Sequence, residues 1–158
     1  RQNVPTFPRG EGEASGDEFA SADLAAKGAY VLADSPTGAV DVILIGTGSE
    51  VQLAVAAREQ LAEQGIGARV VSAPSLEWFA EQDDAYRESV LPASVKARVS
   101  VEAGLAMPWR GIVGDAGRSV SIEHFGASAD YKTLFQKFGI TTEAVVTAAH
   151  ETIAAAGA

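Results

Sequence analysis

Four consecutive residues carry the clearest chemical signal of the chain: Gly46, Thr47, Gly48 and Ser49 follow directly on a run of Val, Ile and Leu. A strand that passes through glycines into a helix is the layout of a dinucleotide-binding turn, where free N–H groups at the helix N-terminus hold a phosphate. The hydroxyl groups of Thr47 and Ser49 would assist. The sequence therefore offers Gly46–Ser49 as a candidate turn for binding an anion or a carboxylate.

This turn departs from the nucleotide-binding fingerprint at two positions. The fingerprint G-x-G-x-x-G needs a third glycine for close packing of helix on strand, but Val51 stands there. It also needs an acidic ribose ligand about 20 residues later, and the next apolar run ends in Ser72-Ala73-Pro74, with no acid before Glu77. A tight turn before a capped helix is therefore favoured. A stand-alone anion- or nucleotide-binding module is the alternative.

Few other residues are candidates for chemistry. The chain has two histidines, no cysteine and no H-E-x-x-H motif, so it offers neither a thiolate nucleophile nor a metal-binding histidine pair. We interpret His124 as a structural histidine and expect His150 on a solvated helix face. Glu102 is a candidate buried acid or a contact to a neighbouring chain. Three aromatic residues are expected in the core or in an interface: Trp78, Phe79 and Trp109.

Composition limits the class of protein. The 158 residues are 47% hydrophobic and 21% charged, which is typical of one globular domain with a core. A formal net charge of −9 argues against a nucleic-acid surface, which is normally basic. No apolar run approaches the about 20 residues of a membrane span, so neither nucleic acid nor a membrane is expected as a partner. The first residue is not methionine, which indicates a fragment of a longer protein.

The elements that must position these residues alternate along the chain. Clusters of β-branched residues predict strands at 29–32, 40–46, 68–74, 97–103 and 119–125. Apolar residues spaced by three or four positions predict helices at 49–64, 83–90, 129–138 and 142–156. The expected N-caps are Ser49, Ser128 and Thr141. The expected C-terminal stops are Gly65 and Gly139.

The strand segments lack polar alternation, which indicates burial on both faces. The sequence therefore predicts an α/β fold: a single three-layer domain with a mostly parallel sheet of about five strands and helices on both faces. Residues 1–27 are rich in proline, glycine and acids, and are expected to be an irregular interdomain linker. Residues 28–158 are expected to form the domain.

Longer motifs resemble one family. The matching segments are RQNVP at the start, KGAYVL at 27–32, ILIGTGSEVQLAVAAREQLAEQGIGARVVSAPSLEWFAEQDDAYRESVLP at 43–92, ARVSVEAG at 97–104 and HFGASADYKTLFQKFGIT at 124–141. In this order they resemble the C-terminal third of a transketolase over essentially the whole chain. The matching domain of a deoxyxylulose-phosphate synthase or of an oxoacid dehydrogenase β subunit is an alternative, but R-Q-N and Y-R-x-S-V-L-P favour transketolase. A further alternative is a pure association module, which exposed Trp78 or Trp109 would favour.

The resemblance implies an activity that composition does not show. Transketolases are cytoplasmic homodimers of the pentose phosphate pathway that transfer a two-carbon ketol unit from a ketose phosphate to an aldose phosphate. They use thiamine diphosphate and Mg²⁺ (or Ca²⁺), held between the first two domains of opposite subunits. The resemblance implies that this third domain binds no cofactor or metal, carries no catalytic residue and is inactive alone. It would pack against the N-terminal and middle domains and support dimerisation.

One residue receives a role from the resemblance. The arginine of the family's S-R-Q-N segment contacts the phosphate of the sugar substrate, and it matches Arg1 here. The planar guanidinium presents paired donors that suit a phosphate. Arg1 is therefore the expected phosphate-binding residue in the parent enzyme.

Overall fold

The structure, a computed structural model, describes residues 19–157 and contains one five-stranded sheet in the order β1-β3-β2-β4-β5. The central strands and β5 run parallel, while β1 pairs with β3 in the antiparallel direction. The strands are β1 Tyr30–Ala33, β2 Val42–Gly46, β3 Ala68–Ser72, β4 Arg98–Val101 and β5 Arg118–Val120. The predicted α/β class and mostly parallel sheet are confirmed.

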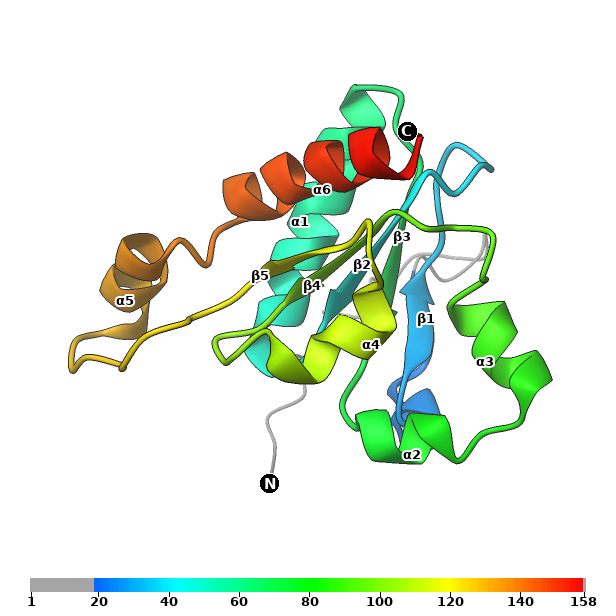
Figure 1. The fold of residues 1–158 in the computed structure, drawn as a ribbon, viewed down its shortest axis with the longest axis horizontal. Coiled ribbons are helices and arrows are strands. Elements are labelled where there is room, and N and C mark those ends of the chain that lie inside the picture. The colour runs from blue at the N-terminus through cyan, green and yellow to red at the C-terminus, as the bar shows by residue number, and fades with distance from the viewer. Residues whose placement is uncertain (1–18, 158) are drawn as a thin grey trace, which may run out of the picture.

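Helices cover both faces of the sheet (Figure 1). The α-helices are α1 Val51–Glu63, α2 Leu76–Ala80, α3 Asp84–Val90, α4 Arg110–Val113, α5 Tyr131–Phe138 and α6 Thr142–Ala156. The 3₁₀ helices are η1 Ala22–Lys27, η2 Gly48–Glu50 and η3 Met107–Trp109. Helices α1 and α6 pack together on one face, and α2, α3 and α4 contribute to the core on the other.

Strand β2 shows why the predicted layers form. Its side chains alternate between two separate apolar cores: Val42 and Leu44 face α1 and α6, while Ile43 and Ile45 face the other side. All four are fully buried. Complete burial of each such side chain stabilises the fold by about 1.5–3 kcal/mol, so the central strand joins both cores.

The expected N-cap of α1 is wrong. No cap hydrogen bond comes from the side chain of Ser49, because a 3₁₀ turn at Gly48–Glu50 precedes the helix and Glu50 stands at its N-cap. Three residues after Ser49, the Nε2 of Gln52 donates to the Ser49 carbonyl oxygen at 2.9 Å. The expected C-terminal stop is confirmed: Gly65 has a φ of +77°.

Three of the four predicted ends of α3, α5 and α6 match the structure. Thr141 caps α6 by accepting a hydrogen bond from the Ala144 N–H at 3.2 Å, and Gly139 ends α5 in the left-handed conformation. The helix α3 begins after Asp83, as expected. The cap at Ser128 is wrong, because Asp130 lies directly before α5 and accepts from the Thr133 N–H instead.

The sequence analysis missed several short helices. The helix α2 is capped by Ser75, and α4 continues directly from the turn η3. The irregular conformation expected up to residue 27 is wrong for Ala22–Lys27, which form η1 behind a Ser21 cap. Such short helices lack a full period of apolar residues, so their stability depends on caps and tertiary contacts. The boundary expected between linker and domain stays a prediction.

The chain leaves the sheet after β5. The expected strand at 119–125 ends at Val120, and residues 121–139, here called the arm, run outward to α5 before α6 returns to the sheet (Figure 1). No residue of α5 is buried. The arm therefore contributes only partly buried side chains to the first core: Ile122, Phe135 and Phe138.

Candidate functional site

The predicted turn Gly46–Ser49 lies where an open α/β sheet normally binds its ligands. The chain passes from β2 through α1 to β3 on one side, and then crosses to β4 on the other side of β2. This reversal places the turn at a topological switch point, at the carboxyl ends of the parallel strands. The location fits the sequence-based hypothesis.

The two glycines have separate structural roles in this turn. A Cβ on Gly46 would come within 2.9 Å of the Cα of Val51, so glycine permits the close approach of strand and helix. Gly48 has a φ of +57°, in the region that favours glycine. Strand–helix packing and a tight turn therefore explain both glycines without a bound nucleotide.

An internal carboxylate stands beside the turn. Glu50 is only 7% exposed, and its Oε2 lies 3.7 Å from the point that a Cβ on Gly48 would occupy. Its negative charge sits at the positive N-terminal end of α1, where carboxylates are stabilised. An external phosphate at the same place would meet a like charge at short range. This geometry disfavours the anion-binding hypothesis for Gly46–Ser49, which stays a prediction.

The other sequence candidates are spread over the structure. Glu102 is half-buried, and its Oε2 accepts a hydrogen bond from Trp109 Nε1 at 2.7 Å. His124 is exposed and its ring lies edge-on to Phe138, with centroids 4.7 Å apart. His150 is exposed, as expected. These groups do not converge on a common centre.

The aromatic residues divide between core and surface. Phe79 and Trp109 are buried in the second core, which is one of the two locations expected for them, the other being an interface. Trp78 is 55% exposed on α2. The burial of Trp109 disfavours the association module, whereas the exposure of Trp78 favours it.

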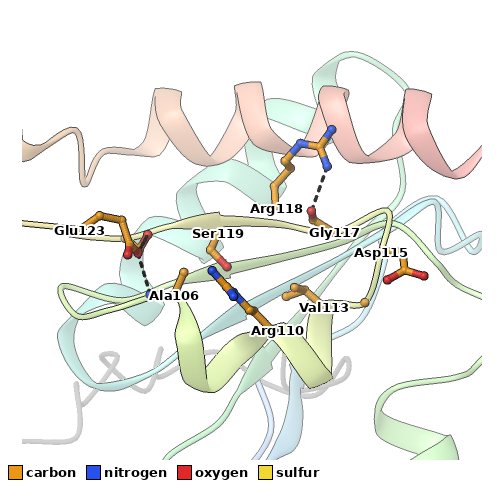
Figure 2. Close-up of a pocket in the computed structure, with 10 residues that line it drawn as sticks. Ala106, Arg110, Val113, Asp115, Gly117, Arg118, Ser119 and Glu123 are labelled. Atoms are coloured by element: carbon orange, nitrogen blue, oxygen red, sulfur yellow. Dashed lines mark hydrogen bonds between the residues drawn. The ribbon is translucent and has the colours of Figure 1, made fainter.

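A groove that the sequence analysis missed opens between α4 and β5, with a volume of about 540 Å³ (Figure 2). Arg118 is engaged there: its Nη1 donates to the carbonyl oxygens of Ala116 and Gly117, and its Nε pairs with Glu151 at 3.1 Å. Arg110 makes no hydrogen bond or ion pair within residues 19–157. Figure 2 shows its side chain extending from α4 into the groove.

The carboxylate of Glu123 closes one end of this groove. Its Oε1 accepts hydrogen bonds from the Ala106 N–H at 2.8 Å and from the Ser121 hydroxyl at 2.9 Å. The Ala106 bond first, and then the Ser121 bond, lower the pKa of Glu123. Arginines and carboxylates thus share the groove, and the described residues assemble no acid–base pair around an electrophile there. The sequence carried no signal for Ser121 and Glu123, because both fall inside the strand expected at 119–125, whereas β5 ends at Val120.

The remaining candidates are the phosphate-binding Arg1, a metal site and a membrane-spanning helix. Arg1 lies outside the described residues. Within residues 19–157, no group of three or more His, Asp or Glu side chains is placed to hold a metal ion. In the same part of the chain, no helix is long and apolar enough to cross a membrane.

Comparisons with known proteins agree with this architecture. Residues 28–141 match the family described as the transketolase-like TK C-terminal domain. The chain is 52% identical to the transketolase of Mycobacterium leprae, over 97% of this chain and 21% of that protein. A chloroplastic transketolase from Craterostigma plantagineum is 54% identical over 80% of this chain and 25% of its own length. The chain thus spans about a fifth to a quarter of these curated relatives.

Solved structures show the same fold. The transketolase from Leishmania mexicana superposes with a TM-score of 0.77 at 39% identity, covering 85% of this chain and 19% of that one. A Pichia stipitis transketolase in complex with sedoheptulose-7-phosphate gives a TM-score of 0.74 at 36% identity, covering 87% and 19%.

The layered fold and the glycine turn at its switch point define an α/β domain without a nucleotide-binding fingerprint. The matches make the assignment specific: the chain belongs to the transketolase family, as the C-terminal domain. They favour this family over the deoxyxylulose-phosphate synthase and oxoacid dehydrogenase alternatives and over a stand-alone binding module.

Proposed function

We propose that this chain is part of an enzyme that transfers a two-carbon ketol unit from a ketose phosphate to an aldose phosphate in the pentose phosphate pathway. The observation that carries the proposal is the 52% identity to transketolase over 97% of the chain. Pichia stipitis transketolases have been solved with sedoheptulose-7-phosphate and fructose-6-phosphate. Those complexes support sugar phosphates as the substrate class.

The cofactors are assigned to the rest of the enzyme. The described residues do not fit thiamine diphosphate and its Mg²⁺ or Ca²⁺, because they group no metal ligands and the carboxylate of Glu50 adjoins the glycine turn. When bound elsewhere in the enzyme, thiamine diphosphate supplies the carbon nucleophile that ketol transfer needs. This domain contributes packing against the N-terminal and middle domains and support for a homodimer. The cytoplasm is the proposed location.

The phosphate-binding role of Arg1 is part of the same proposal. In the full-length enzyme, Arg1→Leu removes a paired donor for the substrate phosphate, so KM for a phosphorylated ketose donor should rise about tenfold or more. A donor without phosphate should be used as before, which separates phosphate binding from general damage. Equal losses for both donors would contradict the role of Arg1.

A transfer assay tests the division of labour. The chain 1–158 is mixed with thiamine diphosphate, Mg²⁺, a ketose phosphate and an aldose phosphate, and the full-length enzyme is assayed beside it. We expect turnover by the full-length enzyme and none by 1–158. Sustained turnover by pure 1–158 would overturn the proposal that catalysis belongs to the rest of the enzyme.

A further inference from the structure

The groove between α4 and β5 contains a guanidinium that the described chain does not engage (Figure 2). Arg110 is exposed and makes no hydrogen bond or ion pair within residues 19–157. The other arginine of the groove, Arg118, is occupied by two carbonyl oxygens and by Glu151. The volume of about 540 Å³ lies within the range of small-molecule sites. Arg110 is therefore available to a small anion that enters the groove.

A second donor points into the groove from β5. The hydroxyl oxygens of Ser100 and Ser119 lie 2.7 Å apart on the paired strands β4 and β5, and either hydroxyl could donate. Ser100 is only 1% exposed, and Ser119 is the one hydrogen-bond partner of its hydroxyl in the described chain. Because a buried hydroxyl without an acceptor for its hydrogen is costly, Ser100 is the donor. The hydrogen of the Ser119 hydroxyl is then free for a ligand on the side where Arg110 reaches in from α4 (Figure 2).

The carboxylate of Glu123 offers an acceptor at one end of the groove. Its Oε1 accepts from the Ala106 N–H and the Ser121 hydroxyl, whereas its Oε2 has no hydrogen-bond partner in the described chain. Those two hydrogen bonds, and more weakly the charge of Arg110, lower the pKa of Glu123, so the group is ionised at neutral pH. A ligand ammonium at Oε2 would be repelled by Arg110. A neutral hydroxyl of the ligand is therefore the better donor to Glu123.

The carboxylates limit the charge that the groove accepts. Asp115 lies at the end opposite Glu123, with Arg110 between them (Figure 2). A ligand with anionic groups at both ends would meet like charges there. A ligand with one anionic group and several hydroxyls would place its charge at Arg110 and its hydroxyls toward the carboxylates.

We propose that this groove binds a phosphorylated polyol, with the phosphate on Arg110 and Ser119 and a hydroxyl of the ligand donating to Glu123. The inference rests on the proposed function, which gives sugar phosphates as the class of molecule that the enzyme handles. A guanidinium forms paired hydrogen bonds with phosphate oxygens. An ionised carboxylate accepts the hydroxyl hydrogens of a polyol.

Hydrogen exchange in the full-length enzyme tests this binding, with sorbitol 6-phosphate as the probe. This probe has a phosphate and hydroxyls but no carbonyl group, so it is neither a ketose donor nor an aldose acceptor. We expect it to slow the exchange of amides in 104–123 of the wild type. Arg110→Leu should weaken its binding about tenfold or more, because a charged hydrogen-bond donor is lost. Arg87→Leu removes an exposed arginine of α3 outside the groove and should leave the binding unchanged.

The variant Glu123→Gln separates a polyol phosphate from a simple anion. The amide keeps one oxygen for the Ala106 N–H but removes the negative charge and one acceptor. We expect sorbitol 6-phosphate to bind Glu123→Gln more weakly than wild type. Inorganic phosphate should bind the variant at least as tightly, because a like charge is gone. Free serine is the amino-acid probe, and it should bind the wild type more weakly than sorbitol 6-phosphate.

Three results would overturn the proposal. The first is exchange of 104–123 that sorbitol 6-phosphate does not slow, or slows in wild type but not in Arg1→Leu, because the probe would then act through the substrate phosphate site. The second is equal binding by Arg110→Leu and wild type, or an equal loss in Arg87→Leu. The third is tighter binding of free serine than of sorbitol 6-phosphate.

Ketol transfer by the wild-type enzyme separates the two claims. Transfer without protection of the groove contradicts only the binding of a polyol phosphate there, and protection without transfer contradicts only the proposed function.

Discussion

The central sheet and the arm place similar side chains in opposite surroundings. Leu44 and Ile45 on β2 are fully buried between two helical layers, whereas Phe125 in the arm is 98% exposed. The helix α6 buries Val145 and Ala149 against the sheet, whereas its neighbour α5 has only partly buried side chains, such as Phe135 and Phe138. Both helices have well-defined caps, so local sequence signals do not account for the contrast.

The contrast shows how each region buries its apolar side chains. Each central strand pairs with a strand on both sides within the described chain, and helices cover both faces of the sheet. The arm leaves from β5, the last strand of the sheet, and packs on the first core only through partly buried side chains, those of Ile122, Phe135 and Phe138. The layers therefore bury their side chains completely, whereas the arm buries its own only in part.

The largest expected effect distinguishes the layers from the arm directly. Leu44→Ala removes a fully buried side chain and should lower the free energy of unfolding of 1–158 by about 2–5 kcal/mol. Tyr131→Ala in the same chain should change it by less than about 0.5 kcal/mol, as for most surface positions. Urea denaturation followed by circular dichroism measures both. Equal losses would mean that the arm belongs to the same cooperative core.

A smaller effect is expected where the second core meets the base of the arm. Glu102→Ala leaves the indole N–H of Trp109 buried without its acceptor, which costs about 1–3 kcal/mol of unfolding free energy. Glu102→Gln keeps an acceptor oxygen and should lose less. If Glu102→Ala is equally harmful in a Trp109→Phe background, the hydrogen bond is not the cause.

The smallest effect concerns the helix caps and their response to pH. The hydrogen bonds from the Thr133 hydroxyl and then from its N–H lower the pKa of Asp130 below the ordinary value of 3.8. The ionised cap therefore supports α5 fully above that ordinary value, and this support is lost as the pH falls through the lowered folded-state pKa. Thr141, which caps α6, does not titrate.

NMR shifts of the two helices in 1–158, followed during acid titration, should show this difference. We expect α5 to lose helicity before α6 as the pH falls, and we expect Asp130→Ser to remove the pH dependence of α5 because serine caps without titrating. A pH response of α5 that persists in Asp130→Ser would contradict the assignment.

Much of the fold could be predicted because its signals are local or periodic. The apolar run at 40–46 predicted the central strand, and Thr141 and Gly139 predicted helix ends that the structure confirms. Caps at Ser49 and Ser128 failed because Glu50 and Asp130 lie closer to the helix starts. The choice among neighbouring polar residues depends on where tertiary packing sets the first turn, which the sequence pattern does not specify.

The candidate site was less predictable than the fold. The glycine turn was found by its spacing, but the buried carboxylate of Glu50 beside it has no spacing signal. The groove with Arg110 and Glu123 brings together residues from α4 and from the end of β5, which meet only through the sheet order. Exposure of Phe125 is also a tertiary property, because an aromatic residue in sequence is normally expected inside.

The intact mass of the polypeptide that carries this sequence in its native cells tests the central claim most directly. We predict a mass several times the 16.3 kDa of residues 1–158, with Arg1 as an internal residue. A mass near 16.3 kDa would contradict this, because ketol transfer would then lack its cofactor-binding domains.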